Sequence, residues 1–176
     1  DAIVTVAQIL PKADCTPGLT ISLGDLFLAD GVTPNPNAGF ATITVADIDG
    51  GSTVGSCQPE TITIDVTEVS CQDAGTNVPV TLTITDANNN SDQCTVNVAV
   101  VDDSNPIVSD CPMDIDQNTD AGLCSAVVNW TPPTADDNCG IVSSTASHNP
   151  GEVFLVGTTP VTYIWTDPSG NTSSCS

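Results

Sequence analysis

Two stretches of the chain alternate between buried-type and surface-type positions with a period of two. They are Val80–Ile84 and Val161–Trp165, and this period predicts a strand with one buried face. Thr85–Cys94 and Thr166–Cys175 follow them, rich in Asp, Asn, Ser and Gly, and each ends in a cysteine. Each copy therefore predicts a strand, a tight turn and a returning strand. One unit used twice predicts two related β-domains in tandem.

Shorter strands complete the pattern. Leu19–Leu23 alternates, and Ala38–Val45 matches Ala121–Val128 in the second copy. Gly24–Asn37 is interpreted as an insertion that the second copy lacks. No segment keeps a period of 3.6, so no long helix is expected. The sequence predicts an all-β fold of two tandem immunoglobulin-like β-sandwich domains stabilised by disulfides.

Pro106 marks the predicted domain boundary, because proline cannot continue a hydrogen-bonded ladder. We expect a strand or linker over residues 1–13, a first domain over 14–103 and a second over 104–176. The linker between the domains is short, so it is expected to be stiff.

Charge narrows the range of partners. The chain carries 22 acidic residues against 1 basic residue, Lys12, and a net charge of −21. Nucleic acid and anionic membranes would be repelled by such a surface. No apolar run approaches the roughly 20 residues that a membrane helix needs. The carboxylates need water, salt or divalent cations to offset their charge.

The 8 cysteines are an even number without a CxxC pair, which predicts four disulfides, an extracellular location and no structural zinc. Ala41 aligns with Cys124, and Cys71 has no counterpart in the second copy. This exchange favours one last-strand bond in each domain and one bond at the end of each sandwich. The predicted pairs are Cys71–Cys94, Cys124–Cys175, Cys15–Cys57 and Cys111–Cys139.

Four motifs of the second domain resemble those of the hyalin repeat, an immunoglobulin-like module of extracellular proteins. They are Asp110–Pro112, Asp137–Gly140, Val156–Thr159 and Thr166–Asn171. The first domain resembles the divergent version found in long tandem-repeat surface proteins of bacteria, although Thr16 replaces the proline after Cys15. The resemblance implies adhesion or scaffolding without catalysis.

Neither catalysis nor sugar stacking is favoured by the residues themselves. His148 is the only histidine, and no nucleophile motif accompanies it, so the chain is not expected to be an enzyme. Trp130, Tyr163 and Trp165 are candidates for a glycan-stacking platform. Their alternation along two strands favours core packing instead.

Acidic loops are the candidate metal site. Calcium takes six to eight oxygen ligands, and loops at the base of the second domain are expected to face the linker. The arrangement is similar to the acidic linkers of cadherins, without their full motif. The alternative is that Asp and Asn form Asx turns that need no metal. The candidate calcium ligands are Asp102, Asp103, Asn105, Asp136, Asp137, Asp167 and Asn171.

The two ends of the sequence suggest assembly. After Cys94 the first domain continues with a full strand, Thr95–Asp102, whereas only Ser176 follows Cys175. The strand-like residues Asp1, Ala2, Ile3, Val4, Thr5 and Val6 are expected to complete the second domain of a preceding copy, covalently or by strand donation. Such a contact is head-to-tail and builds a fibre. The alternative is that the ends only mark where the chain was cut.

Together these patterns predict a structural repeat of an extracellular adhesin or filament that acts as a rigid spacer. Its partners are expected to be other copies of itself, and surface glycans are a further candidate. The alternative is an accessory glycan-binding β-sandwich of a secreted enzyme.

Overall fold

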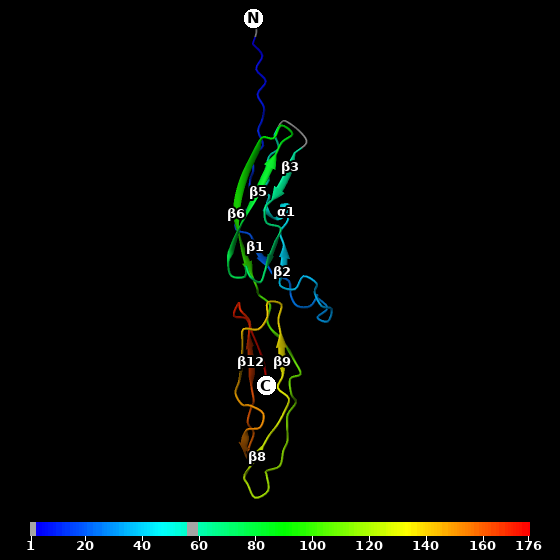
Figure 1. Cartoon of the computed structure of the whole chain (residues 1–176), viewed down its shortest axis with the longest axis vertical. Coiled ribbons are helices and arrows are strands. Elements are labelled where there is room, and N and C mark those ends of the chain that lie inside the picture. Colours follow the sequence, from blue (N-terminus) through cyan, green and yellow to red (C-terminus); the bar gives the residue numbers. More distant parts are fainter. Residues whose placement is uncertain (1–2, 56–59) are drawn as a thin grey trace. The chain divides into compact units, whose positions relative to one another are not determined.

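The structure is a computed structural model that describes residues 3–55 and 60–176. Its contacts divide the chain into two compact units. Unit 1 comprises Asp1–Gly24 and Gly39–Asp102, and unit 2 comprises Asp25–Ala38 and Asp103–Ser176. Strands make up nearly all regular structure (Figure 1). The predicted all-β fold with disulfides is therefore confirmed.

A single short helix occurs in the described residues. It is α1 (Val45–Ile48), and Asp47 accepts hydrogen bonds from the backbone N–H and the hydroxyl of Thr44 at the start of the turn. Ile48 is fully buried. No helix within residues 3–55 and 60–176 has the length and apolar character that a membrane crossing requires.

Unit 1 is built on a long hairpin. β5 (Asn77–Thr85) and β6 (Ser91–Val101) pair antiparallel from Asn77↔Ala99 to Thr85↔Ser91. β3 (Thr61–Ile64) pairs with the outer edge of β5, and β1 (Thr20–Ser22) runs parallel to β6. The four-stranded order is β1-β6-β5-β3, and β2 (Phe40–Thr42) pairs separately with β4 (Glu68–Ser70).

Alternation places one face of this hairpin in the core. The buried side chains are Val80, Leu82, Ile84, Val96, Val98 and Val100. Full burial of each such side chain contributes about 1.5–3 kcal/mol. The opposite face is polar, where the Thr81 and Thr95 hydroxyls lie 3.2 Å apart and Gln93 donates to Thr83. The period-two pattern therefore fixes which face of the hairpin is inside.

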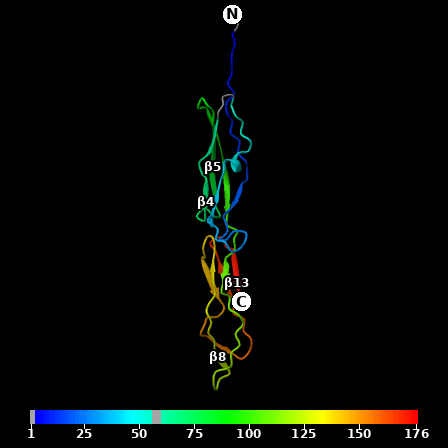
Figure 2. The same cartoon turned by 90° about the vertical axis from the view of Figure 1, so that its right-hand side faces the viewer.

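Unit 2 contains seven short strands, ending in the red strand β13 (Figure 2). One sheet has the order β10-β12-β13, and two strand pairs, β11-β8 and β7-β9, complete the unit. The strands are β7 (Ile107–Ser109), β8 (Ser125–Val127), β9 (Thr134–Asp136), β10 (Ser143–Ala146), β11 (Val153–Leu155), β12 (Tyr163–Thr166) and β13 (Thr172–Cys175).

The core of unit 2 gathers around two aromatic rings. Tyr163 and Trp165 are buried together with Cys175, and their rings stack with centroids 5.9 Å apart. Partly buried side chains packed against them include Val108, Trp130, Ala135, Ile141 and Val161. The predicted inward position of Tyr163 and Trp165 is confirmed.

The segment interpreted as an insertion is grouped by its contacts with unit 2, although it lies between β1 and β2 in sequence. The segment closes on itself, because the Asn35 backbone N–H donates to the Leu26 carbonyl. It is tied to the rest of unit 2 by a 2.5 Å hydrogen bond from the Ser104 hydroxyl to Asp25.

The turn of this segment is organised by Asp30, whose carboxylate accepts hydrogen bonds from Val32 and Thr33. These bonds, with that from the Thr33 hydroxyl the strongest, lower the pKa of Asp30 from 3.8 to about 2.

All four predicted disulfide pairings are wrong. Cys15 bonds to Cys94, and Cys111 bonds to Cys175, with Cα–Cα distances of 5.9 and 6.0 Å. Cys71 and Cys139 are also in disulfides. Cys124 is exposed and carries a free thiol, and the predicted Cys57 lies outside the described residues.

The disulfide pairings differ from the prediction because the first and last segments of each unit lie side by side. β1 runs parallel to β6 with Thr20 opposite Ala99, and the Ala13 N–H donates to Asp92. The first cysteine of unit 1 therefore lies beside the last-strand cysteine, although its backbone also pairs with Asp49. Unit 2 repeats the arrangement, and this non-local pairing leaves no local signal in the sequence.

Candidate functional site

The two recurring turns are held by buried aspartates. Asp86 accepts hydrogen bonds from the backbone N–H groups of Asn88 and Asn90, both at 2.9 Å, and from the Asn90 amide. Gln8 adds a bond at 2.7 Å. These bonds, with that from the Asn90 side chain the largest cause, lower the pKa of Asp86. Asp86 is thus an internal anchor of the hairpin turn.

Asp167 repeats this role in unit 2. Its two carboxylate oxygens accept the backbone N–H and the side-chain amide of Asn171, both at 2.7 Å, and it is 1% exposed. The residue with a left-handed backbone occupies the same position in both turns, three residues after the aspartate. Its φ is +62° at Asn89 and +93° at Gly170. The Asx-turn alternative raised by the sequence is therefore realised at both turns.

Two of the seven candidate calcium ligands come together within unit 2. Carboxylate oxygens of Asp137 and Asp167 lie within 4.8 Å of each other, and both side chains are buried. Asp137 accepts a hydrogen bond from the Cys139 N–H at 2.9 Å. No cationic lysine or arginine occurs in the sequence of this unit, since Lys12 belongs to unit 1.

The other five candidate calcium ligands are not part of this buried pair. Asp103, Asn105 and Asp136 are exposed, and the Asp136 carboxylate accepts the N–H of Asp137. Asn171 donates its amide to Asp167. Asp102 is a buried residue at the end of unit 1. Calcium binding at these residues stays a prediction.

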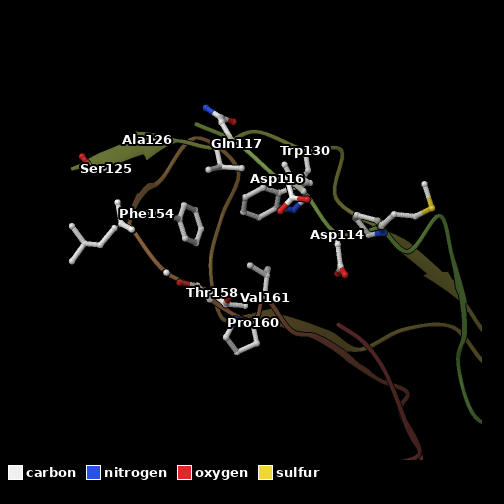
Figure 3. Close-up of a pocket in the computed structure, with 18 of the residues that line it drawn as sticks. Asp114, Asp116, Gln117, Ser125, Ala126, Trp130, Phe154, Thr158, Pro160 and Val161 are labelled. Carbon is white, nitrogen blue, oxygen red and sulfur yellow. The ribbon is translucent and has the colours of Figure 1, made fainter. Parts of the chain in front are cut away.

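A groove of about 680 Å³ opens in unit 2 beside the end of β13. Figure 3 shows the Trp130 and Phe154 rings between the segment that carries Asp116 and Gln117 and the segment that carries Thr158 and Val161. The two rings meet edge to face with centroids 6.0 Å apart. Tyr163, Cys175 and Ser176 complete this end of the lining.

Trp130 is oriented by a specific bond. Its indole N–H donates to the Tyr163 hydroxyl at 2.7 Å, which satisfies both polar atoms at the edge of the core. Trp130 therefore belongs both to the core and to the groove wall. The sequence analysis identified Trp130 and Tyr163 but not Phe154 or residues 113–119, whose contribution to the groove depends on packing between distant segments.

The predicted assembly segment is exposed where it is described. Ile3, Val4 and Val6 are 92%, 85% and 90% exposed, and residues 3–10 are in no strand. Asp1 and Ala2 lie outside the described residues. Completion of another copy by this segment stays a prediction.

Comparison with known proteins supports the hyalin resemblance. Residues 101–176 match the family model of the HYR domain. The chain is 37% identical to hyalin from Lytechinus variegatus over 142 residues, which are 79% of this chain and 25% of that protein. It is 43% identical to hyalin from Strongylocentrotus purpuratus over 84 residues, 47% of this chain and 7% of that protein.

A third relative is the sushi, von Willebrand factor type A, EGF and pentraxin domain-containing protein 1 of Rattus norvegicus. It is 33% identical over 103 residues, 56% of this chain and 3% of that protein. These relatives come from animals and do not support the bacterial part of the predicted resemblance. The chain spans at most a quarter of the length of each relative named here.

Proposed function

We propose that this chain, whose residues 101–176 match the HYR domain, is a structural repeat of an extracellular adhesion-type protein that acts as a rigid, disulfide-bonded spacer. One observation carries the proposal: each unit has a covalent bond between its first segment and its last strand. A load applied along the chain then passes through the disulfide and leaves the strands between the two cysteines unstretched.

The spacer role is tested by pulling the chain from its ends with and without reductant. The bonds enclose sequence separations of 79 and 64 residues. Reduction should release roughly 270 Å and roughly 220 Å of additional length, at about 3.4 Å per extended residue. Single-molecule force spectroscopy measures both steps. Equal extension in oxidised and reduced samples would contradict the proposal.

Calcium is the proposed cofactor. The support is the pair of buried carboxylates, Asp137 and Asp167, in a chain with almost no positive charge. The oxygens of Asp103, Asn105, Asp136 and Asn171 would supply further ligands. Hard oxygen ligands of this kind suit calcium rather than zinc.

Calcium should raise the melting temperature of unit 2, and excess chelator should reverse the effect. Binding at 100 times the dissociation constant stabilises by about 2.7 kcal/mol. The matched variants are Asp137→Asn, which should abolish the calcium response, and Asp120→Asn, which should keep it because Asp120 is outside the carboxylate pair. The same melting curve in calcium and chelator would exclude the site.

Head-to-tail assembly is the third part of the proposal. Asp1–Val6 of one copy would complete unit 2 of the preceding copy, as a tandem chain or by strand donation. The exposed apolar side chains of Ile3, Val4 and Val6 support it. A head-to-tail contact does not close on itself and extends into a fibre.

A further inference from the structure

Three sequences of the form Asn-X-Ser/Thr, in which X is not proline, occur in the chain. They begin at Asn89, Asn129 and Asn171. Such a sequence accepts an N-linked oligosaccharide in proteins that pass through a eukaryotic secretory pathway, and the sugar needs a surface position in the folded protein. Disulfides of the kind found in both units form in the same oxidising compartment. The structure distinguishes the three positions.

Two of these acceptor sequences lie in the two recurring turns, displaced from each other by one residue. Asp86 and Asp167 occupy the same position, and so do Asn90 and Asn171, four residues after the aspartate. The acceptor sequence of unit 1 begins one residue before Asn90, whereas that of unit 2 begins at Asn171 itself. The displacement decides whether the acceptor amide lies outside the turn or inside it.

Asn89 lies on the outside of its turn. The turn joins β5 and β6, the green strands of Figure 1, and the Asp86 carboxylate accepts the N–H groups of Asn88 and Asn90. Asn89 contributes its backbone, which has φ +62° and donates to the Asp86 carbonyl at 3.0 Å. Its side chain is exposed and takes part in no hydrogen bond among residues 3–55 and 60–176. An oligosaccharide on this amide therefore leaves the bonds of the turn in place.

Asn171 is an anchor of its turn. Its amide donates to Asp167 at 2.7 Å, and the carboxylate that accepts this bond belongs to a residue that is 1% exposed. N-glycosylation replaces one of the two amide hydrogens and attaches a sugar ring directly to the nitrogen. The ring would stand beside an almost completely buried carboxylate, so the folded turn disfavours modification of Asn171.

Asn129 is exposed, but the rest of its acceptor sequence is held in place. The middle residue, Trp130, donates its indole N–H to the Tyr163 hydroxyl and packs against the core of unit 2. Thr131 precedes Pro132, which restricts Thr131 to extended conformations. An enzyme must bind all three residues of the sequence together, so these two constraints disfavour Asn129.

We propose that Asn89 carries an N-linked oligosaccharide and that Asn129 and Asn171 stay unmodified. The co-reactant is an oligosaccharide on a lipid diphosphate, and the enzyme is an oligosaccharyltransferase. Asn89 Nδ2 forms a bond to the anomeric carbon of the first sugar as the bond from that carbon to the diphosphate oxygen breaks. The nitrogen loses a proton, the lipid diphosphate leaves with the electron pair, and nothing is oxidised or reduced. The inference rests on the extracellular part of the proposed function.

The site is tested with the full chain secreted from cultured animal cells behind a cleavable signal peptide. Its intact mass should fall by the mass of a single oligosaccharide on treatment with peptide-N-glycosidase. Release in heavy-oxygen water converts a glycosylated asparagine to a labelled aspartate, and peptide mapping should find the label at Asn89 alone. A secreted chain without an oligosaccharide, or a label at Asn129 or Asn171, would overturn the proposal.

Two variants remove the acceptor in different ways. Asn89→Gln removes the asparagine, and Ser91→Ala breaks the acceptor sequence while keeping the residue that adopts a positive φ. Both should lose the oligosaccharide mass completely. The matched control is Ser173→Ala, which breaks the sequence at Asn171 and should leave the oligosaccharide mass unchanged. Loss of the oligosaccharide from the control, or its retention in Asn89→Gln, would contradict the assignment.

The turn of unit 2 provides a test by gain of modification. Gly170 is the counterpart of Asn89, and apart from its chain neighbours a Cβ added there would meet no atom within 4 Å. Gly170→Asn gives unit 2 the acceptor register of unit 1, since Thr172 supplies the hydroxyl. The variant should gain a second oligosaccharide at position 170, and adding Thr172→Ala should remove it. No second oligosaccharide, or one at Asn171, would show that position in the turn does not select the acceptor.

Failure of this inference is distinguishable from failure of the proposed function. A secreted chain that lacks the oligosaccharide and still lengthens in two steps on reduction would overturn the modification of Asn89 alone. A chain that carries the oligosaccharide but has the same extension in oxidised and reduced samples would overturn the spacer role alone.

Discussion

Replacing Cys15 and Cys94 with serine lowers the free energy of unfolding of unit 1 by about 4 kcal/mol. The bond closes a loop of sequence separation 79, and its removal restores conformational entropy to the unfolded chain. Circular dichroism in denaturant follows the loss of strand. The effect should be large because each unit has a small core and depends on covalent support.

Replacing the corresponding disulfide of unit 2 should lower the free energy of unfolding of that unit by a similar amount. Serine at Cys111 and Cys175 opens a loop of sequence separation 64, for which the same entropy relation also gives about 4 kcal/mol. Trp130, Tyr163 and Trp165 all lie in unit 2, so intrinsic fluorescence reports this transition separately.

Cys124→Ser is the matched control for the serine pairs. It should change stability by less than about 0.5 kcal/mol, because this thiol is free and exposed. A large loss from Cys124→Ser, or no loss from the Cys111 and Cys175 pair, would show that the bonding pattern is different.

Asp167→Ala should destabilise unit 2 by about 2–4 kcal/mol. The substitution leaves the Asn171 backbone N–H and amide without their acceptor in a buried turn, and unsatisfied buried donors are costly. Tryptophan fluorescence in denaturant measures the change, and excess chelator removes any contribution from bound metal.

Asp114→Ala is the control for Asp167→Ala, since Asp114 is an exposed carboxylate of the same unit. Its stability should stay within about 0.5 kcal/mol of the parent chain. If Asp167→Ala were equally mild in chelator, the carboxylate would not be an anchor of the turn.

Local features of the fold were predictable from sequence. The alternation of Val80–Ile84 places Val80, Leu82 and Ile84 inside, and these three residues are fully buried. The Asp and Asn residues after each run predict a tight turn, and Asp86 with Asn90 forms it. These features depend on residues that are close in sequence, where periodicity and turn chemistry act directly.

Non-local features were not predictable in the same way. The pairing of Cys15 with Cys94 depends on a first segment that runs beside a strand about 80 positions later. An alignment of two copies shows where cysteines were exchanged, but it does not show which strands are neighbours. The grouping of residues 25–38 with unit 2 and the contribution of Phe154 to the groove are of the same kind.

The candidate site was predictable only in part. Asp137 and Asp167 come together because they follow β9 and β12, whose ends meet within unit 2. The exposed positions of Asp103, Asn105 and Asp136 depend on how the connecting segments turn, and Asp and Asn are common in turns of every kind.

The Cys15–Cys94 disulfide also determines whether proteolysis separates unit 1 into fragments. Any single cut between Cys15 and Cys94, including one in residues 25–38, leaves two pieces that remain joined through the disulfide. The two pieces cannot diffuse apart, so the severed strands can re-pair, as in an uncut chain. Loss of unit 1 by digestion therefore requires either a second cut within the same loop or reduction of the disulfide, and an oxidising environment disfavours the reduction.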